Sequence, residues 1–259
     1  MDITLKDVSY DYPEGKKKAL DGITLAFREG EITAVIGRSG SGKSTLLRLL
    51  NGLRKPTQGT VEGNTDDVAL AFQYPETQLF EETVIKDVEF GPGNKGRSEK
   101  ERRADAEEAL RMVGIGEEKW NVSPLALSGG EKRRAALAGV LAMKCSTLVL
   151  GEMTSGLDGE GKETVYAIMR KLRNEGKTVI FTTHDSEEAA EYADRVILLE
   201  NGKVRSDGTM EAAAECDSYF LTEGLKLKGM LEADGIPVKG KMTSLTGSLR
   251  TLSSLLGME

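Results

Sequence analysis

The sequence predicts an α/β fold in which parallel strands are covered by helices on both faces, with an antiparallel β-subdomain at the N-terminus. Near the N-terminus, apolar residues alternate at period two, as in half-buried antiparallel strands, at Ile3/Leu5 and Ile23/Leu25/Phe27. Later strand patterns are short and continuously apolar, as expected for parallel strands buried on both faces, at residues 147–150, 178–182 and 196–199.

Helical patterns accompany these strands. Between the first two continuous runs, apolar residues repeat at helical spacing at Val165, Ile168, Met169 and Leu172. From about Tyr74 to Leu125 the strand patterns stop and charged helical sequence takes over, notably at residues 98–113. This change predicts a mostly helical insertion in the sheet domain.

These patterns divide the chain into four segments. We expect a sheet core whose N-terminal part spans residues 1–73 and whose C-terminal part spans residues 127–210. The inserted helical subdomain spans residues 74–126, and a small C-terminal extension spans residues 211–259.

Length and composition limit the classes of function. The chain has 259 residues and a net charge of −7, which argues against nucleic acid as a partner, because phosphate backbones select basic surfaces. We expect no membrane span, because no apolar run is long enough, and the first residues do not begin a secretion signal. Cys145 and Cys216 fit no metal or redox spacing, so we expect reduced thiols in a cytosolic protein.

A glycine-rich segment joins a predicted strand to a predicted helix. It reads Gly37-Arg38-Ser39-Gly40-Ser41-Gly42-Lys43-Ser44-Thr45. The glycines allow successive backbone N–H groups to converge on the β- and γ-phosphates of a nucleotide, and the helix N-terminus faces the same anion. Lys43 is expected to reach the terminal phosphates, and Ser44 is expected to ligate Mg²⁺. The segment therefore predicts a P-loop NTPase.

Three further segments narrow the choice among P-loop NTPases. Leu127-Ser128-Gly129-Gly130-Glu131 begins a predicted helix, Thr183-His184-Asp185 follows a predicted parallel strand, and Gln73 lies between the phosphate loop and the helical insertion. In order and spacing they resemble the nucleotide-binding subunit of an ABC transporter over roughly residues 1–210. The resemblance implies ATP and Mg²⁺ as cofactors, and a dimer with two ATP molecules between its subunits.

The same resemblance implies a role for each motif. Ser128, Gly129 and Gly130 would bind the γ-phosphate of an ATP held by the opposite subunit. Gln73 would contact Mg²⁺ or the attacking water, and Glu152 would polarise that water. His184 would contact the γ-phosphate; its position after a parallel strand favours this role over simple packing, because open α/β sheets bind ligands there.

Two more residues receive roles from the resemblance. Asp158, in Ser155-Gly156-Leu157-Asp158, matches the loop that couples the two ATP sites. Tyr12 would stack on adenine, and Tyr10 is the rival candidate for this contact.

One position departs from the family pattern. After the strand residues 148–150 the family places an aspartate that supports Mg²⁺ through its water shell, whereas this chain has Gly151, followed after Glu152 by Met153 where proline is usual. Loss of such an anchor commonly costs about 10- to 100-fold in metal affinity or activity. We therefore expect weakened Mg²⁺ dependence and slow hydrolysis, with the ATP contacts retained. A natural variant and an engineered change both stay open.

The segment from Phe72 to Val84 narrows the resemblance to the ATPase subunits of energy-coupling factor transporters, which import vitamins and transition-metal ions. By this resemblance, residues 73–84 face a transmembrane coupling subunit, a separate membrane subunit binds the substrate, and the chain lies at the cytoplasmic face of the membrane. The tail from about Tyr219 to Glu259 would help to dimerise the ATPase subunits.

A terminal helix is predicted in this tail, with one apolar stripe formed by Leu245, Leu249, Leu252 and Leu256. The stripe either packs on its own domain or makes a subunit contact.

Together these features predict an ATPase that energises import through ATP-driven dimer closure. Two alternatives stay open. One is a switch that dimerises on ATP without hydrolysing it, because of Gly151, and the other is a soluble ABC ATPase that is not tied to transport. The acidic composition and the lack of a long coiled-coil pattern weigh against the second alternative. A homodimer and a heterodimer are both compatible with the sequence.

Overall fold

Two β-sheets form the centre of the computed structural model, in which residues 2–13, 18–72, 79–236, 238 and 242–255 are described. Within these residues, the smaller sheet is antiparallel with strand order β2-β1-β4, and the larger has the order β5-β6-β7-β3-β8-β9. The smaller sheet consists of β1 (Ile3–Tyr10), β2 (Leu20–Phe27) and β4 (Gln58–Glu62). The larger consists of β3 (Ile32–Ile36), β5 (Val68–Ala71), β6 (Thr147–Gly151), β7 (Thr178–Thr182), β8 (Arg195–Glu200) and β9 (Lys203–Gly208).

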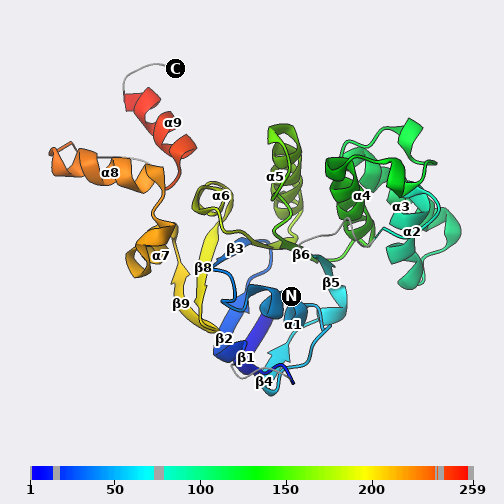
Figure 1. Cartoon of the computed structure of the whole chain (residues 1–259), viewed down its shortest axis with the longest axis horizontal. Coiled ribbons are helices and arrows are strands. Elements are labelled where there is room, and N and C mark those ends of the chain that lie inside the picture. The colour runs from blue at the N-terminus through cyan, green and yellow to red at the C-terminus, as the bar shows by residue number, and fades with distance from the viewer. Residues whose placement is uncertain (1, 14–17, 73–78, 237, 239–241, 256–259) are drawn as a thin grey trace.

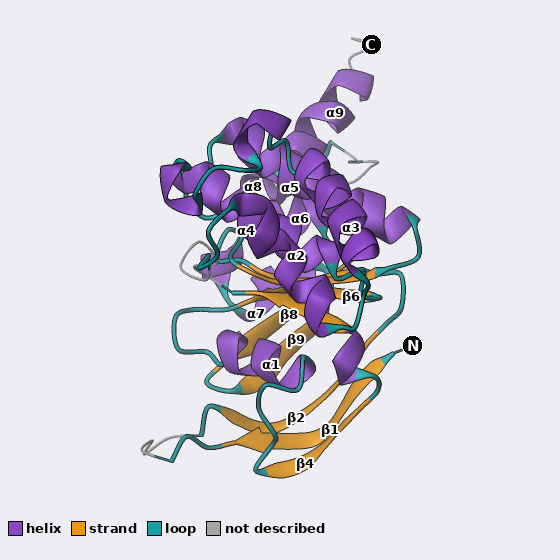
Figure 2. Ribbon diagram, turned by 90° about the vertical axis from the view of Figure 1, so that its right-hand side faces the viewer, coloured by secondary structure: helices purple, strands orange, loops and turns teal. Residues whose placement is uncertain are grey.

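Parallel pairing dominates the larger sheet. Strands β5, β6, β7, β3 and β8, in this spatial order, each pair in parallel with the next strand. Strand β9 pairs with β8 as an antiparallel hairpin. The helix α1 (Lys43–Leu50) lies between the two sheets, whereas α5 (Gly159–Asn174) and α6 (Ser186–Tyr192) cover the opposite face of the larger sheet (Figure 2). The α/β class and the period-two and continuous strand patterns of the sequence are thereby confirmed.

The alternation of side chains along each strand explains the continuously apolar runs. In β6, Leu148 and Leu150 point into the core beneath the helices, whereas Val149 points into the core shared with β1, β2 and α1. Both faces of the strand are therefore buried, so every position of the run must be apolar.

A helical segment lies at the β5 end of the larger sheet (Figure 1). It contains α2 (Val84–Asn94), α3 (Glu99–Met112) and α4 (Gly129–Ala142), which pack on one another. α3 begins where the sequence predicts a helix, because Ser98 and Glu101 form a reciprocal capping box. α4 lies beyond the predicted boundary at residue 126, and the division of the chain at residues 73, 126 and 210 stays a prediction.

The C-terminal part lies at the opposite end of the molecule (Figure 1). It contains α7 (Met210–Cys216), α8 (Glu223–Ala233) and α9 (Leu245–Leu255). On α9, Leu245 is 48% exposed and Leu249 is 57% exposed, so this part of the predicted stripe is not packed on its own domain. Leu256 lies outside the described residues. In the described part of the chain, no helix combines the length and the apolar character needed to cross a membrane.

Candidate nucleotide-binding site

The phosphate loop lies between β3 and α1, and its glycines are required by its shape. Gly40 and Gly42 have φ angles of 76° and 109°, in the left-handed region that favours glycine. A Cβ atom at Gly42 would lie 2.6 Å from the carbonyl oxygen of Ala19. Gly42 is also the N-cap of α1 and offers no side chain to cap the first turn, so the N–H groups of that turn are available to an anion.

A pocket of about 340 Å³ opens at this loop. Most of the residues that the sequence assigns to ATP line it together, although they come from separate parts of the chain. The lining residues are Tyr12, Ala19, Ser39, Gly40, Ser41, Gly42, Lys43, Ser44, Thr45 and Glu152. Gly37 sits at the base of the loop, where a Cβ atom would lie 2.3 Å from the carbonyl oxygen of Leu199.

Lys43 is turned back onto its own loop. Its ammonium donates to the carbonyl oxygen of Gly37 at 2.5 Å and to that of Arg38 at 3.3 Å. Burial lowers the pKa of Lys43, and the nearby charge of Glu152 partly opposes this effect. The Lys43 ammonium, which the sequence assigns to the terminal phosphates of ATP, therefore donates instead to two carbonyl oxygens of its own loop.

The structure distinguishes between the two tyrosines that compete for the adenine contact. Tyr10 is 5% exposed and belongs to the core of the small sheet, whereas Tyr12 lines the pocket. The hydroxyl of Tyr12 lies 3.1 Å from Oγ1 of Thr45 and accepts a hydrogen bond from Arg48 at 3.4 Å. The Tyr12 ring is therefore held at the mouth of the loop, and we keep it as the candidate for stacking.

The edge of the pocket opposite the loop is formed by the end of β6. Glu152 follows Gly151 and has a φ angle of 49°, which is unusual for a residue with a side chain. Its backbone N–H donates to the hydroxyl and the carbonyl oxygen of Thr182 on the neighbouring strand, at 3.1 and 3.2 Å. These bonds to β7 hold the backbone that directs Glu152 toward the loop.

His184 follows β7 and lies beside Glu152. Its Nδ1 atom is 3.9 Å from a carboxylate oxygen of Glu152, which is too long for a hydrogen bond. The His184 side chain is 64% exposed and the Glu152 side chain is 18% exposed. The histidine therefore lies on the solvent side of Glu152, and it is not among the described residues that line the pocket.

The predicted metal site is sparse in ligands. Ser44 lines the pocket and Glu152 faces it, but the buried strand position before Glu152 is Gly151, which offers no carboxylate. Gln73 lies outside the described residues. Within the parts of the chain that the structure describes, no cluster of three or more histidine, cysteine, aspartate or glutamate side chains could hold a metal ion. One hydroxyl and one carboxylate suit Mg²⁺ that takes its other ligands from phosphates and water.

The motif at residues 128–130 lies at the start of α4, outside the pocket of its own chain. The hydroxyl of Ser128 accepts from the backbone N–H of Glu131 at 3.3 Å, and the Glu131 carboxylate accepts from the backbone N–H of Ser128 at 2.9 Å. Lys119 also pairs with Glu131. Hydrogen bonds from Lys119 and from the Ser128 backbone lower the pKa of Glu131 to about 2.

Ser128, Gly129 and Asp158 are exposed, and Gly130 is partly exposed. Asp158 caps α5 by accepting from the backbone N–H of Gly161 at 2.8 Å. None of these four residues is among the described residues that line the phosphate-loop pocket. The structure thus separates the residues assigned to the trans contact from those assigned to the chain's own ATP.

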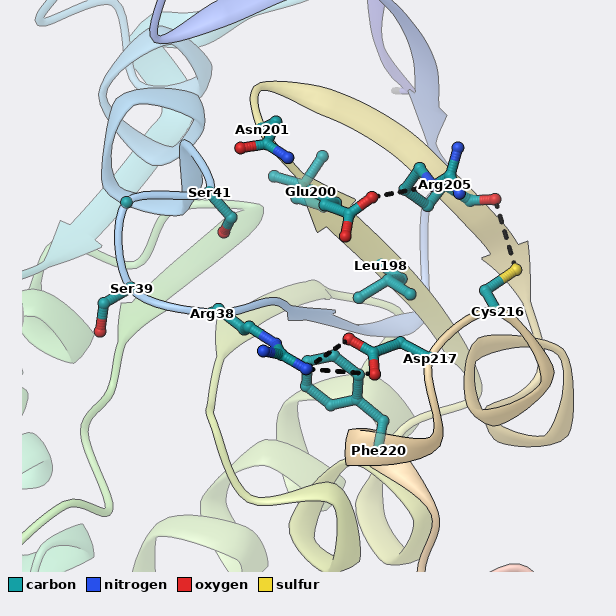
Figure 3. Close-up of a pocket in the computed structure, with 12 residues that line it drawn as sticks. Arg38, Ser39, Ser41, Leu198, Glu200, Asn201, Arg205, Cys216, Asp217 and Phe220 are labelled. Atoms are coloured by element: carbon teal, nitrogen blue, oxygen red, sulfur yellow. Dashed lines mark hydrogen bonds and ion pairs between the residues drawn. The ribbon is translucent and has the colours of Figure 1, made fainter.

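Sequence reasoning missed a second cavity, of about 510 Å³, between the phosphate loop, the end of β8 and residues 216–220 (Figure 3). Arg38 reaches across it to the carboxylate of Asp217 at 3.1 Å, and Arg205 pairs with Glu200 at 3.1 Å. Because both arginines are already paired with carboxylates, whereas the smaller pocket holds Lys43 and the first turn of α1, we assign the nucleotide to the smaller pocket. Arg38 and Asp217 are 179 positions apart in the sequence, so no local sequence pattern predicts their contact.

Sequence reasoning also missed a buried carboxylate beside the catalytic loops. Glu188 on α6 is 7% exposed and accepts hydrogen bonds from Thr154 and Thr183. The sequence offers only a weak indication that this glutamate is buried, namely that it directly precedes Ala189 and Ala190, which both face the core.

Comparisons with known proteins fit this geometry. Residues 20–155 match the ABC transporter family, and this match contains the phosphate loop, residues 128–130 and Glu152. The energy-coupling factor transporter ATP-binding protein EcfA2 of Streptococcus pyogenes serotype M5 (strain Manfredo) is 45% identical, over 99% of this chain and 99% of that protein. This chain belongs to the energy-coupling factor family of ABC ATPases. EcfA2 of Streptococcus sanguinis (strain SK36) is 46% identical over 80% of this ATPase and 81% of that protein.

Solved structures agree with the assignment to the ABC ATPases. cbiO1 from Clostridium perfringens, part of the ABC transporter complex cbiONQ, has a TM-score of 0.73 and 31% identity, covering 89% of this chain and 94% of that chain. The ATP-binding cassette MJ0796, in a dimeric post-hydrolysis state bound to ADP and Pi, has a TM-score of 0.74 and 31% identity, covering 80% of this chain and 98% of that chain. As a member of this family, the chain uses ATP.

Proposed function

We propose that this ABC ATPase hydrolyses ATP between two ATPase subunits and thereby energises an energy-coupling factor importer. The observation that carries the proposal is the phosphate-loop pocket, which holds Lys43, Ser44 and Glu152 around one space. A cation, a metal-binding hydroxyl and a carboxylate around one phosphate site suit phosphoryl transfer to water.

The residues of the pocket divide the chemistry. Glu152 accepts a proton from the attacking water as it approaches the γ-phosphate in line with the leaving oxygen. Lys43 leaves the carbonyl oxygens of Gly37 and Arg38 and donates to the terminal phosphates instead, which stabilises the charge that develops there. His184 approaches the same phosphate from the solvent side. Mg²⁺, held by Ser44 and Gln73 together with the phosphates, would neutralise phosphate charge when bound.

A second subunit completes each site. The exposed N-terminus of α4, with Ser128, Gly129 and Gly130, offers backbone N–H groups to the γ-phosphate of an ATP held by the partner. Asp158, exposed at the N-terminus of α5, would link the two sites. ATP then favours the closed dimer because it contacts both subunits, and loss of the γ-phosphate lets the interface open.

Two other surfaces suit partner subunits. Phe80, within the segment assigned to the transmembrane coupling subunit, and Phe90 on α2 form an exposed aromatic pair whose rings meet edge to face at 4.9 Å. The exposed Leu245 and Leu249 of α9 suit a dimerisation element in the C-terminal extension. In this arrangement the ATPase is peripheral at the cytoplasmic face of the membrane, and a separate membrane subunit binds the vitamin or transition-metal ion.

Phosphate release from ATP by the purified chain, with and without Mg²⁺, tests the proposal. A Lys43→Met variant is the matched control, because it keeps the length of the side chain and removes its charge. We expect Mg²⁺-dependent release that falls at least about 100-fold in the variant. Release that is equal in both proteins would point to a contaminating ATPase and contradict the proposal. ATP-dependent dimerisation without any release would instead favour a non-hydrolysing switch.

A further inference from the structure

We propose that Glu188 is a positioning residue that holds the loop of Glu152 and the loop of His184 in a fixed relation. This inference rests on the proposed ATPase function. Glu188 lies on α6 and does not line the phosphate-loop pocket, so its effect on the reaction passes through the two loops that it joins.

One oxygen of the Glu188 carboxylate bridges the two loops. Oε2 accepts a hydrogen bond from the hydroxyl of Thr183 at 2.8 Å and another from the hydroxyl of Thr154 at 3.0 Å. Thr183 immediately precedes His184, and Thr154 lies two residues after Glu152. Each catalytic side chain is therefore within two residues of a hydroxyl bound to the same oxygen atom.

The other carboxylate oxygen has a partner of its own. Oε1 accepts from the ammonium of Lys162 on α5 at 3.1 Å. Burial raises the pKa of Glu188, but its interactions with the hydroxyls of Tyr166 and Thr183 and with Lys162 outweigh burial and leave the pKa below its usual range. A buried charge is retained at little cost only when such partners satisfy it. The carboxylate therefore stays ionised and keeps accepting from both threonines.

The bridge is anchored in rigid structure. Thr154 is 8% exposed and Thr183 is 3% exposed. The Thr183 hydroxyl also accepts from the backbone N–H of Asp185 at 3.0 Å, and Asp185 caps α6 at the backbone N–H of Glu187 at 2.9 Å. The loop after β7 is thus closed on itself, and Glu188 connects it to the loop after β6.

This connection matters because catalysis depends on the relative placement of the two side chains. A misplacement of about 1 Å in a catalytic group costs about 100-fold in rate. The ATP contacts assigned to Lys43, Ser44 and Tyr12 come from the phosphate loop and from the segment after β1, so they do not depend on the bridge. Loss of the bridge is therefore expected to lower kcat while KM for ATP stays the same.

The neighbouring acids on α6 provide a matched control. Glu187 accepts from the backbone N–H groups of Glu223 and Leu245, and Glu191 pairs with Arg250 at 3.2 Å. Both acids therefore face the C-terminal extension and not the catalytic loops. Glu191 is also largely buried, with its side chain 13% exposed. Glu191→Gln thus removes a comparable carboxylate from the same helix without touching the bridge.

The experiment compares steady-state phosphate release by the full chain and its variants. In Thr154→Val, the hydroxyl is lost with little change in shape, and we expect kcat to fall about 10-fold with KM within twofold. In Glu188→Ala, the whole bridge is lost, and we expect a fall of about 10- to 100-fold. In Glu188→Gln, the amide oxygen still accepts from both threonines, so most of the loss is recovered. Glu191→Gln keeps the kcat of the unmodified chain.

A double variant tests whether the two residues act together. In the Glu188→Ala background, Thr154→Val should cause no further loss beyond twofold, because the acceptor of its hydroxyl is already gone. Independent, additive losses would overturn the bridge. Equal changes in kcat and KM would also overturn the bridge. A Glu188→Gln variant with a kcat as low as that of Glu188→Ala would overturn it as well. If Glu188→Ala does not fold, Thr154→Val alone still decides, because its kcat must fall while KM holds.

Amide hydrogen exchange gives a readout that does not need turnover. Loss of the bridge should speed exchange in residues 152–155 and 183–185 of Glu188→Ala, with both segments unchanged in Glu191→Gln. Suppose that the unmodified chain releases no phosphate, while exchange still becomes faster in both segments of Glu188→Ala and in neither segment of Glu191→Gln. That result would contradict the ATPase function and support the bridge. If the unmodified chain hydrolyses ATP and Glu188→Ala matches it in both phosphate release and hydrogen exchange, the bridge is contradicted and the ATPase function is not.

Discussion

Glu152 and His184 face each other across two neighbouring strands, with 3.9 Å between a carboxylate oxygen and Nδ1. Glu152 follows β6, His184 lies two residues after the end of β7, and the two strands pair in parallel with Gly151 opposite Thr182. The sheet thus brings together at its carboxyl edge two groups that are 32 positions apart. Parallel α/β sheets bind ligands at this edge.

The first prediction concerns the proton acceptor. Glu152→Gln should lower phosphate release at least about 100-fold while ATP still binds, because the amide cannot take a proton from water. The phosphate contacts of Lys43 and Ser44 remain, so an ATP-bound dimer should accumulate. Size-exclusion chromatography with light scattering, with and without ATP, would detect it. Retention of substantial turnover in this variant would remove Glu152 from the proposed role.

The second prediction concerns the missing aspartate. Gly151→Asp should raise Mg²⁺-dependent hydrolysis by about 10- to 100-fold, because it adds a carboxylate beside the bound metal. Gly151 lies within β6, in register with Thr182, and strand backbone is open to any residue with a side chain. Gly151→Asn is the control, since it adds the same volume without the charge. Equal turnover in the two variants and the unmodified chain would show that the position does not limit the reaction.

The third prediction concerns the base of the nucleotide. Tyr12→Ala should weaken ATP affinity by about 10-fold, because stacking on a base contributes about 1–3 kcal/mol. Tyr12→Phe should bind ATP nearly as well, since it keeps the ring and loses only the contacts of the hydroxyl with Thr45 and Arg48. Isothermal titration with ATP measures both. Unchanged affinity in Tyr12→Ala would leave the adenine without its assigned partner.

The fourth prediction concerns pH and the start of α4. The pKa of Glu131 is about 2 in the folded chain, whereas an unfolded glutamate titrates near about 4.3. Because the folded pKa is the lower one, the ionised cap stabilises the fold fully above about pH 4.3 and loses this contribution as the pH falls toward about 2.

Urea unfolding of the unmodified chain and of Glu131→Gln measures this contribution. We expect Glu131→Gln to be less stable by about 1 kcal/mol at neutral pH, with the difference shrinking below about pH 4.3. Glu160→Gln, at an exposed acid in the first turn of α5, is the control and should show a smaller loss. A Glu131→Gln difference that stays constant down to pH 3 would contradict the assigned cause.

Much of the fold could be predicted from local patterns. The apolar run 147–150 fits a buried parallel strand because both of its faces pack against other layers, and the Ser98 capping box marks the start of α3. The phosphate loop is also a local feature. Its glycines satisfy steric needs within a few residues, so residues 37–45 indicate the site before the fold is known.

The choice between Tyr10 and Tyr12 needed the structure. Both tyrosines fit the expected distance before the loop, and their rings lie 5.0 Å apart. Tyr10 is the last residue of β1 and pairs with Leu20, so its side chain enters the core, whereas Tyr12 lies beyond the strand. The direction of a side chain at a strand end depends on the partner strand, which no local pattern specifies.

The sequence by itself determined several of the strands and helices, the phosphate loop and the likeness to the ABC ATPases, because each depends on residues close together in the chain. Only the tertiary structure decided that Glu188 joins Thr154 to Thr183 and that Arg38 meets Asp217. Those contacts follow from the order of strands in the larger sheet and from the helices packed on it. That order is set by the burial of many apolar faces at once, so it cannot be derived from any single segment.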